Sequence, residues 1–247
     1  MRPSRRIAFL AAVIATFTAT AGCGTRISRS EEIEIGQRVA REIESRYRTY
    51  ESPTVTRLGQ RLASVSDRPD LPYRFRVIDR AEINAVSLPG GPVYVFEGLL
   101  RATGDDTGML AGVLAHEVAH IAERHAAEQI ERRQWYGLGI GILTGRGAAR
   151  DIATIAANLQ LLSYSRRQDY EADREAVRYL QRAGFDPRGL VRFFDLLLAR
   201  ERGGDRTISW LRTHPTTEAR RNRVARMVGM ATTASAGSPA ESAHSGG

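Results

Sequence analysis

The sequence predicts one α+β domain over residues 31–230, mostly helical, with a small β-sheet packed against a single buried helix. Most of this stretch has apolar residues at helical spacing. Two shorter stretches, YRFRVID (73–79) and NAVSLPGGPVYVF (84–96), alternate or turn as strands do. One helical stretch, MLAGVLAHEVAHIA (109–122), is apolar almost throughout, which indicates a helix that is buried on all sides.

The first residues predict an exported protein. MRPSRR followed by IAFLAAVIATFTATAG is typical of a secretory signal over residues 1–22, and its apolar stretch is shorter than the ~20 residues of a membrane-spanning helix. The only cysteine, Cys23, follows directly, and TATAGC resembles a bacterial lipobox, in which the cysteine is acylated. An ordinary signal peptide cut near Ala21 is the alternative. The lipobox predicts a periplasmic lipoprotein anchored to a membrane through Cys23, and Gly24 favours the outer membrane.

The charge of the chain does not predict a nucleic-acid partner. The formal net charge is +8, and all 36 basic residues are arginine. Acidic residues alternate with these arginines along the helices, and the sequence has no recognition helix, zinc finger or aromatic stacking pattern. We therefore expect no nucleic-acid binding.

The first elements of the domain follow a short linker at 23–30. Apolar residues at helical spacing predict a helix over 31–50 and a second helix after Pro53. YRFRVID (73–79) alternates as a half-buried strand does.

The middle of the chain predicts a hairpin and then a long helix. NAVSLPGGPVYVFEGLL (84–100) has the pattern of a strand, a turn, a strand and a helix start. Asp105 and Asp106 favour a helix N-terminus, and one continuous helical pattern runs from them to about Arg133. The glycine-rich stretch YGLGIGILTGRG (136–147) predicts a mobile loop.

The last third of the domain is predicted to be helical. Helices are expected at about 150–164, at 166–183 and at 187–201, and a turn followed by a last helix is expected over 210–227. The low-complexity tail at 231–247 predicts disorder.

His116, Glu117 and His120 form a His-Glu-x-x-His motif within the buried helical stretch. Positions i and i+4 lie on one helix face, so both imidazoles can reach one zinc ion. Glu117 is offset by one residue and can accept the proton of the attacking water as a general base. A chance occurrence on a surface helix is the weaker interpretation. The flanking residues are apolar, so the helix is expected to be buried, and ionisable groups in a buried helix need partners.

A third histidine, His125, follows in the same stretch. Metzincin proteases use His-Glu-x-x-His-x-x-Gly-x-x-His, but here Glu123 stands at the glycine position and Ala126 at the last histidine position. A continuous helix would also point His125 away from the two motif histidines. We therefore expect a structural or supporting role for His125, and a third metal ligand from another helix.

Five motifs carry a resemblance to a known family. The chain resembles the metallopeptidases related to HtpX and the CAAX prenyl endopeptidases, and most closely their periplasmic BepA-like and LoiP-like members. The resemblance covers about residues 31–228 and implies a zincin fold of the gluzincin type, one zinc ion and hydrolysis of peptide bonds. The motifs are, in order, NAVSLPGGPVYVFEGLL, LAHEVAHIAERH, YSRRQDYEAD, AGFDP and THPTTEAR.

The resemblance also implies the remaining metal ligand. In the family this is a glutamate four residues before an aspartate, within the segment Ser-Arg-x-x-Glu-x-Glu-Ala-Asp. By position the ligand is Asp169, so this chain departs from the family, and Asp173 would orient a metal-binding histidine. Glu171 has the family's residue type, but it lies about 200° around the helix from Asp169. Asp169 is therefore the favoured ligand and Glu171 the alternative.

One more histidine and one strand complete the candidate site. By resemblance His214 approaches the zinc and plugs the resting site, although it could instead stabilise an oxyanion or start a helix. Proteases commonly hold peptides as an added strand at a sheet edge. The stretch GPVYVFEG (91–98) is the expected edge, with Val93, Tyr94 and Val95 as substrate-binding residues, although an ordinary core strand fits the same pattern.

The leading hypothesis is a membrane-anchored zinc endopeptidase that faces the periplasm, with Glu117 as general base. The resemblance implies misfolded or unfolded cell-envelope proteins as substrates. The aspartate at 169 motivates a second hypothesis, a catalytically weak or silent lipoprotein that acts as a chaperone or adaptor. The two hypotheses differ in metal content and turnover. A zinc hydrolase that acts on other bonds is a third possibility.

Overall fold

The structure is a computed structural model that describes three stretches of the chain. Within them it is mostly helical around one four-stranded mixed sheet, which confirms the predicted α+β fold class. The described stretches are residues 26–135, 163–215 and 218–230. The predictions that lie outside them concern the signal at 1–22, Cys23, the loop at 136–147, nearly all of the helix expected at about 150–164, and the tail at 231–247.

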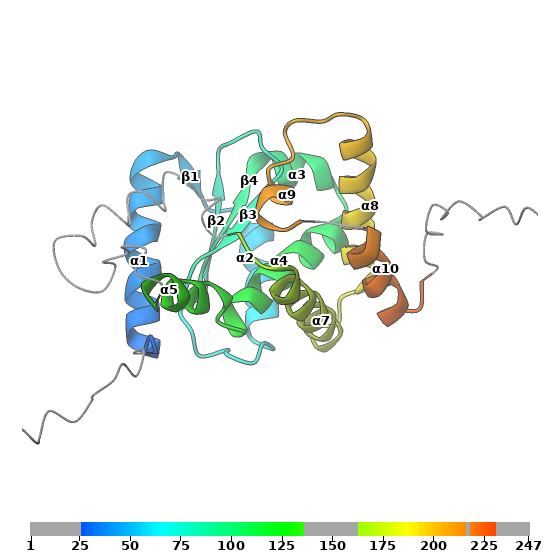
Figure 1. Ribbon diagram of the computed structural model, residues 1–247. Helices are drawn as coiled ribbons and strands as arrows, with labels where there is room; N and C mark the ends of the chain where they lie inside the picture. Colours follow the sequence, from blue (N-terminus) through cyan, green and yellow to red (C-terminus); the bar gives the residue numbers. More distant parts are fainter. Residues whose placement is uncertain (1–25, 136–162, 216–217, 231–247) are drawn as a thin grey trace, which may run out of the picture.

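The described elements are helices interrupted by four short strands (Figure 1). In chain order they are α1 (Arg29–Arg46), β1 (Thr49–Tyr50), α2 (Pro53–Ala63), β2 (Arg74–Ile78), β3 (Ala85–Ser87), β4 (Pro92–Phe96), α3 (Glu97–Thr103), α4 (Thr107–Ala122), α5 (His125–Trp135), α7 (Arg166–Arg182), α8 (Arg188–Arg202), α9 (Trp210–Thr213) and α10 (Glu218–Met227).

The first helix differs from its prediction at both ends. It begins inside the expected linker because Ser28 and Glu31 form a capping box, in which each side chain accepts a hydrogen bond from the other's backbone N–H. It ends at Arg46, and Thr49–Tyr50 form β1 in place of further helix. These β-branched and aromatic residues suit a strand, and β1 pairs antiparallel with β2.

The strand expected at the sheet edge lies in the interior of the sheet. The order is β1-β2-β4-β3, so β4 pairs with β2 in parallel and with β3 antiparallel. The prediction that this strand is the sheet edge is therefore wrong, since the backbone groups of Val93, Tyr94 and Val95 face two neighbouring strands and all three side chains are buried. The physical reason is that the turn after β3 returns the chain against it, which places β4 between the two strands.

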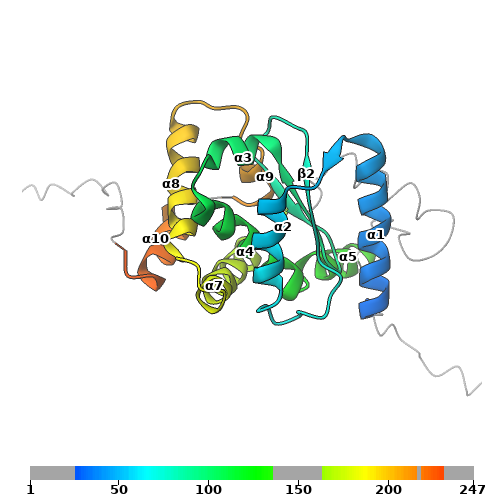
Figure 2. The same cartoon turned by 180° about the vertical axis from the view of Figure 1, so that it is seen from behind.

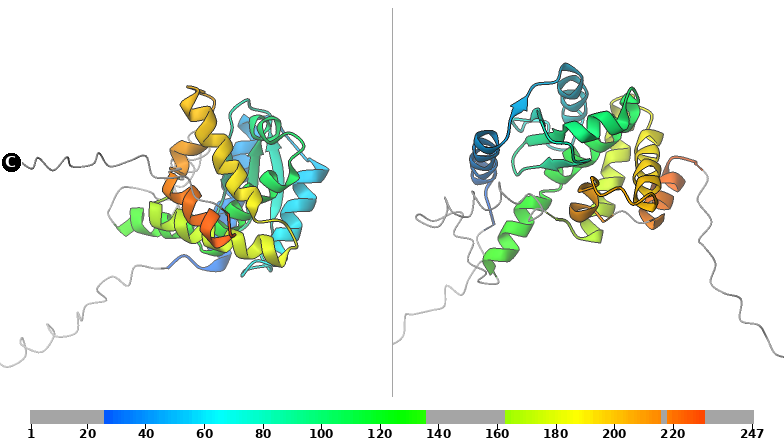
Figure 3. Two further views of the ribbon diagram at one scale, coloured as in Figure 1. Left: turned by 90° about the vertical axis from the view of Figure 1, so that its right-hand side faces the viewer. Right: turned by 90° about the horizontal axis from the view of Figure 1, so that it is seen from above.

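Both faces of the sheet are covered by helices. Tyr94 and Phe96 of β4 pack with the apolar face of α1, whereas Val93 and Val95 belong to the core formed with α2 and α4. This alternation follows the two-residue period of a strand. Accordingly, α1 and α2 lie on opposite sides of the sheet (Figure 2), and α4 lies on the side of α2 (Figure 3).

Helix α4 is the centre of the core, and it is shorter than expected. Its N-terminus is capped by Asp106, whose carboxylate accepts a hydrogen bond from the backbone N–H of Met109. The prediction of one continuous helix to about Arg133 is wrong. Helix α4 ends at Ala122, Arg124 takes the left-handed conformation with φ 60°, and α5 starts at His125 in a new direction.

Candidate metal centre

Helix α4 brings its two histidines together in the core. His116 and His120 are one helical turn apart, and their Nε2 atoms lie 3.0 Å from each other. Both side chains are buried, at 0% and 1% exposed. Two imidazoles in this position need a group between or beside them that satisfies both nitrogens.

Helix α7 supplies a carboxylate to the same point. A capping box between Ser165 and Gln168 starts the helix, so Asp169 lies in its first turn and faces α4. The Oδ1 atom of Asp169 lies 3.6 Å from Nε2 of His120 and 3.8 Å from Nε2 of His116. Its side chain is fully buried.

The alternative ligand, Glu171, lies elsewhere. Its side chain is 28% exposed and pairs with Arg167 one turn earlier on α7. Its Oε2 atom lies 3.3 Å from Nε2 of His125 and contacts neither motif histidine. The structure thus brings Asp169, and not Glu171, to the pair of motif histidines.

His214 completes a cluster of four. It follows α9 and stacks on Trp210, with ring centroids 4.6 Å apart. Its Nδ1 atom lies 3.2 Å from Nε2 of His116 and 3.1 Å from Oδ1 of Asp169. Together, His116, His120, Asp169 and His214 each offer one ligand atom, and these atoms all lie within 4.8 Å of one another.

Asp173 lies one turn beyond Asp169 and stands behind His116. Its Oδ1 atom is 3.0 Å from Nδ1 of His116. The buried guanidinium of Arg220 donates to both of its oxygens, at 2.8 and 2.7 Å, and lies 3.4 Å from Oδ2 of Asp169. Arg220 thus places one positive charge beside two buried aspartates. We did not assign it from the sequence, although it ends the motif THPTTEAR.

Glu117 faces the cluster from the sheet side of α4. One carboxylate oxygen accepts a hydrogen bond from the hydroxyl of Ser87 on β3, at 2.8 Å. The other lies 3.5 Å from Nε2 of His214. The side chain is fully buried. Sequence reasoning missed Ser87, because its stretch NAVS indicated only a strand.

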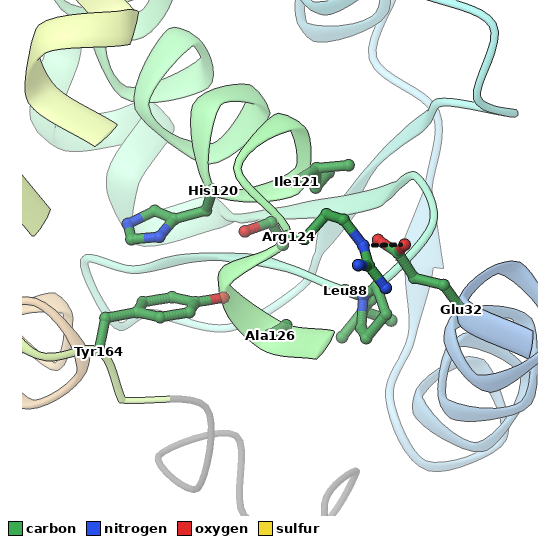
Figure 4. A pocket seen from close by; sticks show the side chains of 9 residues that line it. Glu32, Leu88, His120, Ile121, Arg124, Ala126 and Tyr164 are labelled. Atoms are coloured by element: carbon green, nitrogen blue, oxygen red, sulfur yellow. Dashed lines mark hydrogen bonds and ion pairs between the residues drawn. The ribbon is translucent and has the colours of Figure 1, made fainter. Parts of the chain in front are cut away.

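Tyr164 covers the other side of the cluster. Its ring stacks on His120, with centroids 3.8 Å apart and planes 19° apart. Burial raises the pKa of its hydroxyl, so the group stays protonated at neutral pH. Figure 4 shows Tyr164 and His120 at one end of a narrow hollow that also contains Leu88 and Ala126. The residue was not predicted, since a tyrosine before a helix start carries no distinctive signal.

The protonation states suit a divalent transition metal. Burial and the neighbouring His116 hold the pKa of His120 well below its usual range, so its imidazole is neutral at neutral pH. Burial alone would raise the pKa of Asp169, but the neighbouring His120 and His214 and the charge of Arg220 hold it well below its usual range. Neutral imidazoles and an ionised carboxylate are the donors that such ions take.

The comparisons with known proteins agree with this geometry. The sequence pattern of peptidase family M48 matches residues 49–228. The chain belongs to peptidase family M48. This confirms the resemblance expected from the five motifs. The M48 match begins at β1 and ends after α10, so it contains every residue of the cluster and leaves α1 outside.

Relatives within M48 come from bacteria and from mitochondria. The beta-barrel assembly-enhancing protease of Escherichia coli strain K12 is 33% identical over 224 residues, which cover 83% of this chain and 46% of that protein. The mitochondrial metalloendopeptidase OMA1 of Schizosaccharomyces pombe is 33% identical over 171 residues, or 67% of this chain and 50% of that protein. The putative beta-barrel assembly-enhancing protease of Vibrio cholerae is 29% identical over 213 residues, or 80% and 44%.

Two facts limit what the similarity to these relatives implies for this chain. The chain spans about half the length of the curated relatives it matches. In addition, none of the helices in the described stretches combines the length and the apolar composition that crossing a bilayer requires.

Proposed function

We propose that this chain is a zinc-dependent endopeptidase in which Glu117 is the general base. The observation that carries the proposal is the buried cluster of His116, His120, Asp169 and His214, with the carboxylate of Glu117 facing it. Membership of a metallopeptidase family supports the same chemistry.

We assign the zinc to His116, His120 and Asp169. Asp169 is favoured over Glu171 because its carboxylate lies among the histidines, whereas Glu171 pairs with Arg167 and His125. Aspartate is shorter than the family's glutamate by one methylene, but α7 packs directly against α4 and Oδ1 of Asp169 lies 3.6 Å from Nε2 of His120. When bound, zinc supplies a Lewis acid that polarises the scissile carbonyl and acidifies the attacking water.

The protein's own groups then handle the proton. Glu117 accepts a proton from the attacking water and later passes it to the leaving amine. The hydrogen bond from Ser87 holds the Glu117 carboxylate in one orientation. His214 lies against three members of the site, and we assign it to the resting form, where it fills the space that water and substrate take during turnover.

We further propose that unfolded or misfolded proteins of the cell envelope are the substrates, and that a lipid on Cys23 anchors the enzyme to the outer membrane. The lipobox-like TATAGC and the relation to the beta-barrel assembly-enhancing proteases support this placement. Because β4 is an interior strand, it offers no free edge to a substrate strand. In the described sheet the edge strand beside Glu117 is β3, whose Ser87 donates a hydrogen bond to the Glu117 carboxylate.

The alternative function is a chaperone or adaptor with a catalytically silent site, which is motivated by the aspartate at position 169 where the family has glutamate. Asp169 lies with the histidines, within reach of one metal ion, which supports a working metal site over a degenerate one. The two functions make different predictions for turnover.

The test compares the purified full chain with its Glu117→Gln variant. We expect about one zinc per chain in both, and hydrolysis of an unfolded protein by the wild type alone, with a loss of about 10² to 10⁴-fold in the variant. Glu34→Gln on the exposed face of α1 is the matched control and should cleave as the wild type does. A wild type that binds no zinc would refute the proposal, and zinc without hydrolysis would favour the adaptor.

A further inference from the structure

We propose that His125 is a positioning residue that presents His120 to the metal, and that Glu171 sets the direction of this contact. The inference rests on the proposed zinc function. His125 and Glu171 lie beside the cluster and are not among the proposed metal ligands.

His120 has one nitrogen on each side of this arrangement. Its Nε2 atom faces the cluster, 3.0 Å from Nε2 of His116 and 3.6 Å from Oδ1 of Asp169. Its Nδ1 atom lies 2.8 Å from Nδ1 of His125, which is 1% exposed. A metal can bind Nε2 only if that atom carries no hydrogen, so the hydrogen of neutral His120 must be on Nδ1.

This requirement fixes the direction of the histidine pair. His120 donates from Nδ1, so Nδ1 of His125 must accept, and neutral His125 then carries its own hydrogen on Nε2. That nitrogen lies 3.3 Å from Oε2 of Glu171, which accepts the hydrogen bond. Arg167 holds Glu171 in place at 2.8 Å. A carboxylate at Nε2 therefore selects the tautomer of His125 that leaves His120 free to bind metal.

The turn at Arg124 brings His125 to this position. A left-handed φ of 60° is uncommon for a residue other than glycine and needs support from its surroundings. The guanidinium of Arg124 donates from Nε to Oε2 of Glu32 at 3.1 Å, and Glu32 also binds Arg68 at 2.9 Å. Figure 4 shows this pair at the end of the hollow opposite Tyr164.

The result is a chain of buried and part-buried contacts from α1 to the metal site. Glu32 is 1% exposed and pairs with Arg68 and Arg124, whose side chains are only 17% and 21% exposed. Without the turn, α4 would continue and carry His125 away from His120. Since α1 lies outside the M48 match, this support comes from a part of the chain that the family pattern does not include.

The experiment measures metal affinity in the full chain, with competition against a chelator for Zn²⁺ and visible absorption for Co²⁺ in the same site. In His125→Leu, which has no acceptor, we expect zinc affinity to fall by about 10- to 100-fold and the cobalt bands to shift. In His125→Asn, an amide oxygen can replace Nδ1 as acceptor, so affinity should stay within about threefold of the wild type. If His125 only filled space, His125→Asn would not restore the wild-type cobalt spectrum.

Glu171→Ala provides an independent arm, because the residue is part-exposed and its loss does not open the core. We expect a smaller fall in zinc affinity in the same direction. Wild-type zinc affinity in Glu171→Ala would overturn the inference, even if His125→Leu fails to fold. Wild-type zinc affinity in His125→Leu would overturn it as well. A wild-type protein that binds neither metal would overturn the proposed function as well.

Discussion

The two motif histidines are each held from behind by a different pair of side chains. Nδ1 of His116 faces Asp173, which binds Arg220, and Nδ1 of His120 faces His125, which contacts Glu171. Such support directs both Nε2 atoms to one point and gives buried ionisable groups their partners.

The contacts of His214 predict how the resting site is controlled. Because His214 lies against His116, Asp169 and Glu117, it competes with water and substrate for the same space. We expect His214→Ala to raise the initial rate of hydrolysis of an unfolded protein several-fold, at unchanged zinc content. A fall of about 10²- to 10³-fold at unchanged zinc content would instead assign His214 to stabilising an oxyanion, because removal of one such donor costs about that much in rate.

Single residues could be predicted where spacing constrains them. Helix geometry predicts that His116 and His120 share one face, and the angle of about 200° between Asp169 and Glu171 around the helix predicts that only one of them faces the histidines. Ser87, Tyr164 and Arg220 could not be predicted in the same way. They reach the site through the fold of β3, the approach to α7 and the packing of α10, and no local pattern encodes such contacts.

At the scale of elements, the helix that carries the motif depends on its N-terminal cap. A hydrogen bond from Arg192 lowers the pKa of Asp106, and burial opposes this only in part. A carboxyl group with a lowered folded-state pKa stabilises the fold above its unfolded-state pKa of about 3.9, and this stabilisation disappears as pH falls through the folded-state value.

We therefore expect Asp106→Ala to lower the free energy of unfolding at pH 7 by about 1 kcal/mol. Asp106→Asn keeps a capping oxygen but loses the charge, so its deficit relative to the wild type should shrink below about pH 4. Urea unfolding at several pH values measures both. The exposed neighbour Asp105→Ala is the control, expected to lie within about 0.5 kcal/mol of the wild type. An equal deficit at pH 7 and pH 3 would contradict the ion-pair contribution.

Helix and strand periods predicted most of the described elements, and the misses have physical causes. The break at Arg124 has no glycine, proline or asparagine to signal it. The turn is supported instead by Glu32, which lies on a helix distant in sequence. The place of β4 in the sheet depends on strand order, and an apolar run fits an interior strand and an edge strand alike.

At the scale of the whole molecule, the site joins segments that are far apart in sequence. Helix α4, helix α7 and the segment after α9 meet at the cluster, and β3 approaches it through Ser87. The sheet separates α1 from this centre, yet Glu32 links α1 to the turn beside His125. The M48 match therefore contains the whole cluster but not α1, which supports the turn beside His125 from outside the matched residues.

We propose that one zinc ion is held by His116, His120 and Asp169. Diffraction data collected at the zinc absorption edge, from crystals of the purified protein, test it most directly. We predict a single anomalous peak at about 2.0–2.2 Å from Nε2 of both histidines and from a carboxylate oxygen of Asp169. A peak bonded to Glu171 in place of Asp169, or crystals of active protein with no zinc at the cluster, would contradict it.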